Sequence, residues 1–160
     1  MTPDDLVERL SELRAIEQLK YRYVRLIDTK EWNELETLFV EDATATYSDG
    51  KYAFEGRDAI MAFLRDAMAS TNMLTSHKVH QPEIEVDGET ATATWALDDV
   101  VVHLDYDMTI RGAAFYRDNY VKVDGEWKIK HTGYERIYEE MEPRREDLKL
   151  TSRKWKPSAS

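Results

Sequence analysis

Apolar residues recur every three or four positions along the first part of the chain and alternate with polar residues later, which predicts two kinds of element. The first apolar stripe consists of Leu6, Leu10, Leu13, Ile16, Leu19, Tyr23 and Ile27. Its period predicts one long helix with a single apolar face. The preceding Thr2-Pro3-Asp4-Asp5 is typical of a helix start, with a cap residue, a proline and two acids. The same period predicts shorter helices over 31–39 and 57–69.

Alternation with a period of two predicts strands in the remaining segments. Asp49-Gly50, a turn signal, separates a strand ending at Tyr47 from its return over 51–54. Two more Asp-Gly pairs delimit four longer strands, at 77–86, 89–104, 111–123 and 126–137. The predicted order is helix, helix, hairpin, helix and a four-strand antiparallel meander, an α+β fold with helices on one face of the sheet. Because long strands twist and curl, we expect a concave mouth that suits a small apolar ligand.

Length and composition indicate one globular domain, which we place at 1–140. The chain has 160 residues, of which 42% are apolar and 34% are charged. It has no cysteine, which excludes disulfides, thiolate chemistry and sulfur-ligated metals. No apolar run has the length of a membrane helix, and the acidic N-terminus is unlike a secretion signal. We therefore expect a cytoplasmic protein with no membrane partner.

Charge is distributed unevenly along the chain. The net charge of −10 argues against a nucleic-acid partner, because a nucleic-acid binder needs a cationic face. Segment 141–160 is nevertheless basic, with six Lys or Arg residues and three Asp or Glu residues. It is predicted either to be a solvated tail or to dock on an acidic surface, such as that of a neighbouring subunit. Trp155 favours docking, because an exposed indole gains from an apolar partner.

The motifs of several enzyme classes are absent from the sequence. It has no serine-nucleophile motif, glycine-rich phosphate loop or dinucleotide fingerprint. Its four histidines are His77, His80, His103 and His131, and no two of them have the helical spacing of metal ligands. We therefore expect no metal site. The remaining chemistry is proton transfer by His, Asp, Glu and Tyr side chains.

One histidine and one aspartate in the predicted meander are candidates for such chemistry. Asp99 interrupts the apolar face of its strand, and a buried carboxylate needs a partner. Pairing Val86 with Glu89 at the turn between the two strands places His77 opposite Asp98. A one-residue bulge, which Pro82 would suit, could bring His77 and Asp99 onto one face. A carboxylate beside a histidine fixes its tautomer and raises its basicity. The alternative is that Asp98 and Asp99 form only the polar end of a strand.

Two further candidates lie near the end of the first predicted helix. Tyr23 falls on the apolar stripe and is either a core tyrosine or a hydrogen-bond donor in the mouth of the sheet. Asp28 lies where a carboxylate meets the negative end of the helix dipole, so a partner is expected, unless it is a solvated turn residue. Arg22, Arg25 and Arg136 are possible partners of Asp28.

Several stretches are similar to those of a known family. They are Tyr23-Val24-Arg25-Leu26-Ile27-Asp28, Trp32-Asn33-Glu34-Leu35-Glu36-Thr37, Tyr47-Ser48-Asp49-Gly50-Lys51, Trp95–Asp99 and Gly112–Glu139. In these stretches the chain resembles the bacterial bile acid 7α-dehydratases, of the SnoaL-like, polyketide-cyclase-like branch of the nuclear transport factor 2-like superfamily. The resemblance extends from Leu13 to about Ser152, whereas the loop over 104–110 and the end of the chain differ.

The resemblance implies a cone-shaped fold, in which a curled antiparallel sheet packs on three N-terminal helices around a central pocket. It also implies functional residues by matching position: Tyr23, His77 and Asp99 as catalytic residues, with Asp28 and Arg136 supporting them or binding substrate. Asp28 and Arg136 remain possible partners of each other. The implied assembly is a homo-oligomer, with a trimer favoured over a dimer.

The activity that the resemblance implies is cofactor-independent loss of water from a hydroxylated 3-oxo-4-ene steroid or a similar apolar polycyclic substrate. His77 would remove a proton, Asp99 would orient His77, and Tyr23 would donate a hydrogen bond to the ketone oxygen as charge develops there. Two alternatives use the same fold. One is an isomerase or cyclase acting on another polycyclic ketone, and the other is a non-catalytic domain that binds a small ligand.

Overall fold

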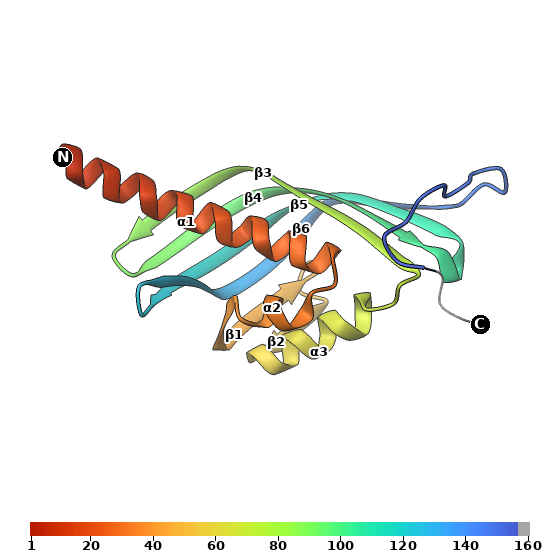
Figure 1. The fold of residues 1–160 in the computed structure, drawn as a ribbon, viewed down its shortest axis with the longest axis horizontal. Coiled ribbons are helices and arrows are strands. Elements are labelled where there is room, and N and C mark those ends of the chain that lie inside the picture. Colours follow the sequence, from red (N-terminus) through yellow and green to blue (C-terminus); the bar gives the residue numbers. More distant parts are fainter. Residues whose placement is uncertain (157–160) are drawn as a thin grey trace.

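The computed structural model describes residues 1–156, and its element order follows the predicted one. The elements are α1 (Pro3–Asp28), α2 (Trp32–Glu36), β1 (Phe39–Tyr47), β2 (Tyr52–Glu55), α3 (Arg57–Met68), β3 (Met73–Asp87), β4 (Thr90–His103), a 3-10 turn (Leu104–Tyr106), β5 (Met108–Val123) and β6 (Glu126–Pro143). Helix α1 crosses the sheet diagonally, while α2 and α3 lie beside β1 and β2 at one end (Figure 1). The fold is therefore α+β, with N-terminal helices packed on a curled sheet, as expected.

The long helix begins where its capping residues predict. The Thr2 hydroxyl accepts a hydrogen bond from the Asp5 backbone N–H at 3.1 Å, and the Asp5 carboxylate accepts one from the Thr2 N–H at 2.7 Å. Two of the unpaired donors of the helix N-terminus are thereby satisfied. The second half of α1 packs on the sheet, whereas its first turns extend beyond it and leave Leu6 and Leu10 exposed (Figure 1).

The second predicted helix is shorter than expected, because α2 ends at Glu36 and Phe39 begins β1. The prediction of a helix to residue 39 was wrong for a physical reason. Leu38 and Phe39 are both buried, and Phe39 lies opposite Ile129 of β6 in the sheet. Tertiary pairing thus overrides a local pattern that either element can satisfy.

The six strands form one mixed sheet in the order β2-β1-β6-β5-β4-β3. The last four strands form the predicted antiparallel meander, and β1 and β2 form the predicted hairpin. The sheet also has one parallel pair, in which β1 lies beside β6. This pair joins the hairpin to the meander, so the sheet is mixed rather than antiparallel throughout.

A bulge between β3 and β4 sets the register of the candidate residues. The pairing shifts between His80 and Glu83, and Gln81 has a positive φ of 48°. The bulge predicted at Pro82 is thus confirmed, and His77 lies opposite Asp99. The predicted turn register is wrong, because Val86 pairs with Ala91 rather than with Glu89. Two more shifts interrupt the pairing of β5 with β6. Bulges increase the local twist of a sheet, and here they accompany long strands that curl around the end of α1 (Figure 1).

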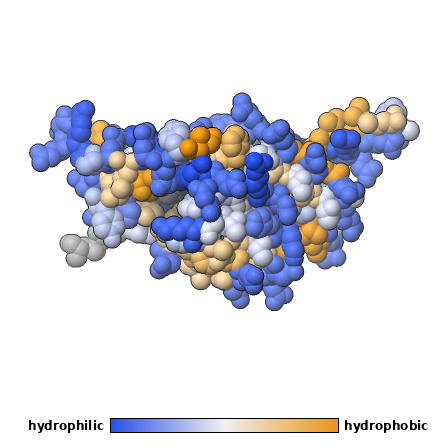
Figure 2. All heavy atoms as spheres, turned by 180° about the vertical axis from the view of Figure 1, so that it is seen from behind, coloured by the Kyte–Doolittle hydropathy of each residue, from blue (hydrophilic) through white to orange (hydrophobic). Residues whose placement is uncertain are grey.

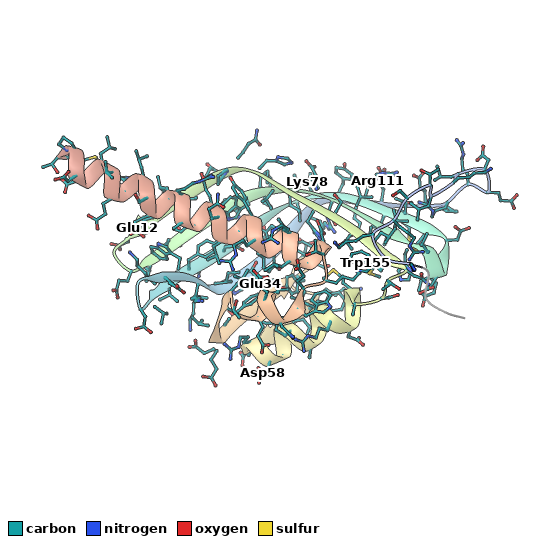
Figure 3. All side chains as sticks on the ribbon, viewed as in Figure 1. Glu12, Glu34, Asp58, Lys78, Arg111 and Trp155 are labelled. Atoms are coloured by element: carbon teal, nitrogen blue, oxygen red, sulfur yellow. The ribbon has the colours of Figure 1, made fainter. Side chains whose placement is uncertain are left out.

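The basic segment returns to the body of its own chain. Strand β6 continues to Pro143, and the Arg144 N–H donates to the Asp107 carbonyl at 2.8 Å. Arg153 donates hydrogen bonds to the Thr71 carbonyl and the Asn72 side chain. The Trp155 ring lies 4.9 Å from the Lys30 amine, near the end of α1 (Figure 3). Docking on a neighbouring subunit stays a prediction, and residues 157–160 of the predicted tail lie outside the described residues.

The surface is mostly hydrophilic. Viewed from behind, charged and polar side chains cover most of the molecule, with hydrophobic ones scattered among them (Figure 2). Within residues 1–156, no helix combines the length and the apolar character that crossing a membrane requires.

Candidate active site

A cavity of about 160 Å³ lies where the end of α1 and helix α3 meet the inner face of the sheet. Its lining residues are Tyr23, Ile27, Tyr47, Ser48, Tyr52, Phe63, Leu64, Ala67, Met68, His77, Asp99, Val101, Tyr116, Tyr134 and Arg136. Four of the five predicted site residues are in this wall: Tyr23, His77, Asp99 and Arg136. The fifth, Asp28, lies directly behind His77.

His77 is held by Asp28 rather than by Asp99. Asp28 is the last residue of α1, and its carboxylate lies 2.6 Å from His77 Nδ1. The same carboxylate accepts hydrogen bonds at 2.8 Å from the His77 backbone N–H and from the Thr75 hydroxyl. Strand β3 is an edge strand, so Asp28 also pairs a backbone donor that has no partner strand. The arginine partners predicted for Asp28 are therefore wrong, and so is the prediction that Asp99 orients His77.

The arrangement leaves His77 prepared for proton transfer. A carboxylate on Nδ1 selects the tautomer in which Nδ1 carries a proton, so Nε2 has a free lone pair. No hydrogen bond within residues 1–156 engages Nε2. The His77 side chain is only 12% exposed, and its ring is part of the cavity wall. An imidazole in this state can accept a proton from a bound molecule and return it.

Asp99 forms an ion pair with Arg136 that crosses an intervening strand. Arg136 Nη1 and Nη2 lie 2.5 Å and 3.0 Å from the two carboxylate oxygens of Asp99. Burial opposes the charge of the guanidinium, but the hydrogen bonds and charge of Asp99 outweigh it and raise the pKa of Arg136 above its ordinary value. The pair thus gives the cavity wall a permanent cation whose carboxylate partner is buried.

Gly112 makes this pairing possible. Asp99 is on β4, Arg136 is on β6, and Gly112 lies opposite Asp99 on β5, between them. A Cβ atom at this position would overlap Arg136 Nη1. The glycine is therefore needed for space rather than for an unusual backbone angle.

This geometry makes a prediction about Gly112→Ala. The added methyl group will push the guanidinium off Asp99 and lower the free energy of unfolding by about 1–3 kcal/mol, as overpacking does. Urea denaturation of the wild type and the variant measures the change. The same substitution in an Arg136→Ala background is the control, and it should cost less. Equal costs in the two backgrounds would contradict the spacing role.

Five tyrosines line the cavity, and four of them are the largely buried Tyr23, Tyr47, Tyr116 and Tyr134. The Tyr23 and Tyr47 hydroxyls lie 3.2 Å apart, and the Tyr134 hydroxyl lies 2.9 Å from that of Ser48. Burial raises the pKa of Tyr23, Tyr47 and Tyr116 well above the ordinary tyrosine value, and neighbouring phenols add to the effect. These phenols therefore stay protonated and can donate hydrogen bonds to an oxygen of a ligand.

Sequence reasoning found Tyr23 but missed the roles of Tyr47, Tyr116 and Tyr134. A signal was present, because Tyr47 and Tyr116 occupy inward positions in the alternating pattern of their strands. Alternation alone does not separate a tyrosine of the core from one that faces a cavity.

No three His, Asp or Glu side chains within residues 1–156 are grouped to hold a metal ion. The groups that can act on a ligand are thus an imidazole, several phenols and a guanidinium.

A match to a known family accompanies this geometry. Residues 8–133 match the SnoaL-like domain. The chain belongs to the SnoaL-like family. The matched range contains most of α1, both hairpin strands and most of the meander, with Tyr23, Asp28, His77 and Asp99. Arg136 lies just beyond it.

Solved structures of similar shape include proteins named as a dehydratase and a dehydrochlorinase. A putative scytalone dehydratase from Novosphingobium aromaticivorans is 26% identical, with a TM-score of 0.76 over 91% of this chain and 93% of that one. A type 3 LinA hexachlorocyclohexane dehydrochlorinase from Novosphingobium barchaimii is 17% identical, with a TM-score of 0.78 over 91% and 98% of the two chains. A protein of unknown function from Mycobacterium tuberculosis is 26% identical, with a TM-score of 0.71 over 85% and 76%.

Proposed function

We propose that this SnoaL-like protein is a cofactor-independent lyase that removes water from a cyclic hydroxyketone. The observation that carries the proposal is the His77 imidazole, fixed through Nδ1 by Asp28 and facing an enclosed wall of phenols. Elimination beside a ketone needs a base for a C–H proton and a donor for the ketone oxygen. Two of the similar solved structures are named as a dehydratase and a dehydrochlorinase, and both names denote elimination reactions. They support the same reaction class here.

The proposed reaction uses only the substrate and side chains that line the cavity. His77 Nε2 takes a proton from the carbon beside the hydroxyl-bearing carbon, and the electrons of that C–H bond move toward the ketone. Tyr23 donates a hydrogen bond to the ketone oxygen as negative charge develops there. The charge then returns to form the new double bond as the C–O bond breaks, and hydroxide leaves with the proton from His77 as water. Arg136 and Asp99 line the same cavity as an ion pair, so Arg136 acts there as a fixed hydrogen-bond donor rather than as an unpaired positive charge.

The size of the cavity bears on the substrate. A cavity of about 150 Å³ in another protein holds benzene, and this one measures about 160 Å³. A substrate of one ring therefore fits without rearrangement. The steroid implied by the resemblance to bile acid 7α-dehydratases has four rings, so it is larger than this cavity and would require lining side chains to move. The smaller substrate and the steroid share one feature, a hydroxyl group placed for elimination toward a ketone.

Incubation with hydroxyketones of one, two and four rings tests the proposal. The four-ring member should be a 7α-hydroxy-3-oxo-4-ene steroid. We expect a product that absorbs at longer wavelength than the substrate, because loss of water extends the conjugated system. Diode-array spectra will detect this product. Exchange of a substrate proton for deuterium without loss of water would identify an isomerase or cyclase instead. Binding of a ketone with neither exchange nor product would identify a non-catalytic domain.

A further inference from the structure

A buried ion pair lies directly behind the phenols of the cavity. Lys20 Nζ is 2.7 Å from Asp118 Oδ2, and both side chains are completely buried. Lys20 lies one helical turn before Tyr23 on α1, and Asp118 lies on β5 two residues after Tyr116. Lys20 is not among the residues that line the cavity. Its amine is therefore behind the wall, and it does not touch a bound ligand.

The Lys20 ammonium is directed at the tyrosine rings as well as at Asp118. Nζ lies 3.3 Å from the centre of the Tyr116 ring and 4.5 Å from that of Tyr23. The ion pair lacks the angles of a hydrogen bond, and Nζ makes no other hydrogen bond within residues 1–156. The π faces of two phenols are consequently its remaining partners, and a cation is attracted to such faces. Burial lowers the pKa of Lys20, while the charge of Asp118 and its contact with Nζ oppose that shift.

Asp118 is itself fixed from the far side. The Tyr120 hydroxyl donates to Asp118 Oδ2 at 2.7 Å, and the Trp95 indole N–H donates to the Tyr120 oxygen at 3.1 Å. Both of these rings are buried. The chain of contacts runs from Trp95 through Tyr120 and Asp118 to Lys20, and ends on the two cavity rings. A network of this kind holds its last members in one orientation.

We propose that Lys20, held by Asp118, is a positioning residue that fixes Tyr23 and Tyr116 and favours negative charge on an oxygen that accepts their hydrogen bonds. The inference rests on the proposed function, in which these phenols stabilise a developing oxyanion. A positive charge behind a phenol makes its O–H a stronger donor, and a low-dielectric surrounding increases the effect. The Asp118 charge acts in the opposite sense, because it raises the pKa of Tyr23 and Tyr116, so the Lys20 effect depends on the close contact of Nζ with the two rings. The role is indirect, because the wall of rings separates Lys20 from the ligand.

Paired variants separate this role from a purely structural one. Lys20→Met with Asp118→Asn removes both charges and keeps an oxygen that accepts from Tyr120. Replacing a buried ion pair by neutral groups is often tolerated, so this variant should remain folded. The matched control is Glu12→Gln with Lys122→Met, at a 2.6 Å ion pair that also joins α1 to β5 but lies far from the cavity (Figure 3). Thermal melts will establish that each variant is folded.

The decisive measurement uses 4-nitrophenol as a probe, because its ionised and neutral forms absorb at different wavelengths. Bound to the wild type, the probe should show more of the ionised form than it shows bound to the neutral-pair variant. We expect the ratio of ionised to neutral probe to fall about tenfold, which corresponds to about one pKa unit of the probe. The control variant should leave the ratio unchanged. His77 and Arg136 are the same in all three proteins, so they do not account for a difference.

Turnover supplies the second measurement. For a substrate found in the assay above, kcat should fall about ten- to a hundredfold in the neutral-pair variant with little change in KM, because misplaced donors act mainly on the transition state. An unchanged probe ratio would overturn the inference, as would an equal fall in the control variant or no binding of the probe to the wild type. If the first neutral pair does not fold, Lys20→Gln with Asp118→Asn replaces it. The probe needs no turnover, so its result decides this inference even if no hydroxyketone is a substrate.

Discussion

Replacing His77 by alanine is expected to lower kcat by about a hundred- to ten-thousandfold, which is the usual contribution of a positioned general base. The imidazole is held by Asp28 and borders the cavity, so its loss removes the group that takes the substrate proton. Binding should change less, because the phenols and Arg136 remain. Steady-state kinetics on the hydroxyketone that the wild type turns over fastest will measure both effects.

The chain offers a matched control for this variant. His80 lies three residues later on the same strand, and its Nε2 is 3.3 Å from the Asp98 carboxylate. Both of these side chains are about half exposed or more, and neither lines the cavity. His80→Ala therefore also removes a histidine beside a carboxylate, but on the outer face of the sheet, and should leave kcat unchanged. Full turnover by His77→Ala would remove the proposed mechanism whatever the substrate is.

The position of His77 could be predicted from the sequence, but its partner could not. The bulge near Pro82 was predicted and His77 does lie opposite Asp99, but the predicted register at the turn is wrong, because Val86 pairs with Ala91 rather than with Glu89. Opposite positions within a strand pair say nothing about a third element that packs on them. The end of α1 brings Asp28 to the free edge of β3, and this contact depends on the angle at which the helix crosses the sheet (Figure 1).

The partner of Asp99 was hidden for a related reason. Arg136 reaches it across β5 from a strand that is not adjacent to β4, and only the missing side chain of Gly112 leaves the space. Strand alternation predicts which residues share a face but does not show which side chains reach over a neighbour. The parallel pairing of β1 with β6 is likewise a long-range contact without a turn signal.

Lys20→Met alone is expected to lower the free energy of unfolding by about 3–5 kcal/mol, because it leaves the buried Asp118 carboxylate without its cation. That is a large share of the roughly 5–15 kcal/mol that stabilises a typical domain. Within residues 1–156, only the Tyr120 hydroxyl would then donate a hydrogen bond to this carboxylate. Urea denaturation followed by tryptophan fluorescence will measure the loss.

The same experiment on Lys122→Met shows whether the loss comes from burial or from any ion pair between α1 and β5. The Lys122 and Glu12 side chains keep 25% and 19% of their exposure, so water can solvate the glutamate that remains. A loss of about 1 kcal/mol or less is expected there, as for pairs near the surface.

Adding Asp118→Asn to Lys20→Met should recover most of the lost stability, because no buried charge is then left unpaired. Equal losses of unfolding free energy in the two single variants, or no recovery in the double variant, would contradict this expectation. Either result would show that the Lys20 side chain stabilises the fold by packing rather than by charge. Recovery of stability without recovery of kcat would separate the energetic role of the pair from its effect on the cavity phenols.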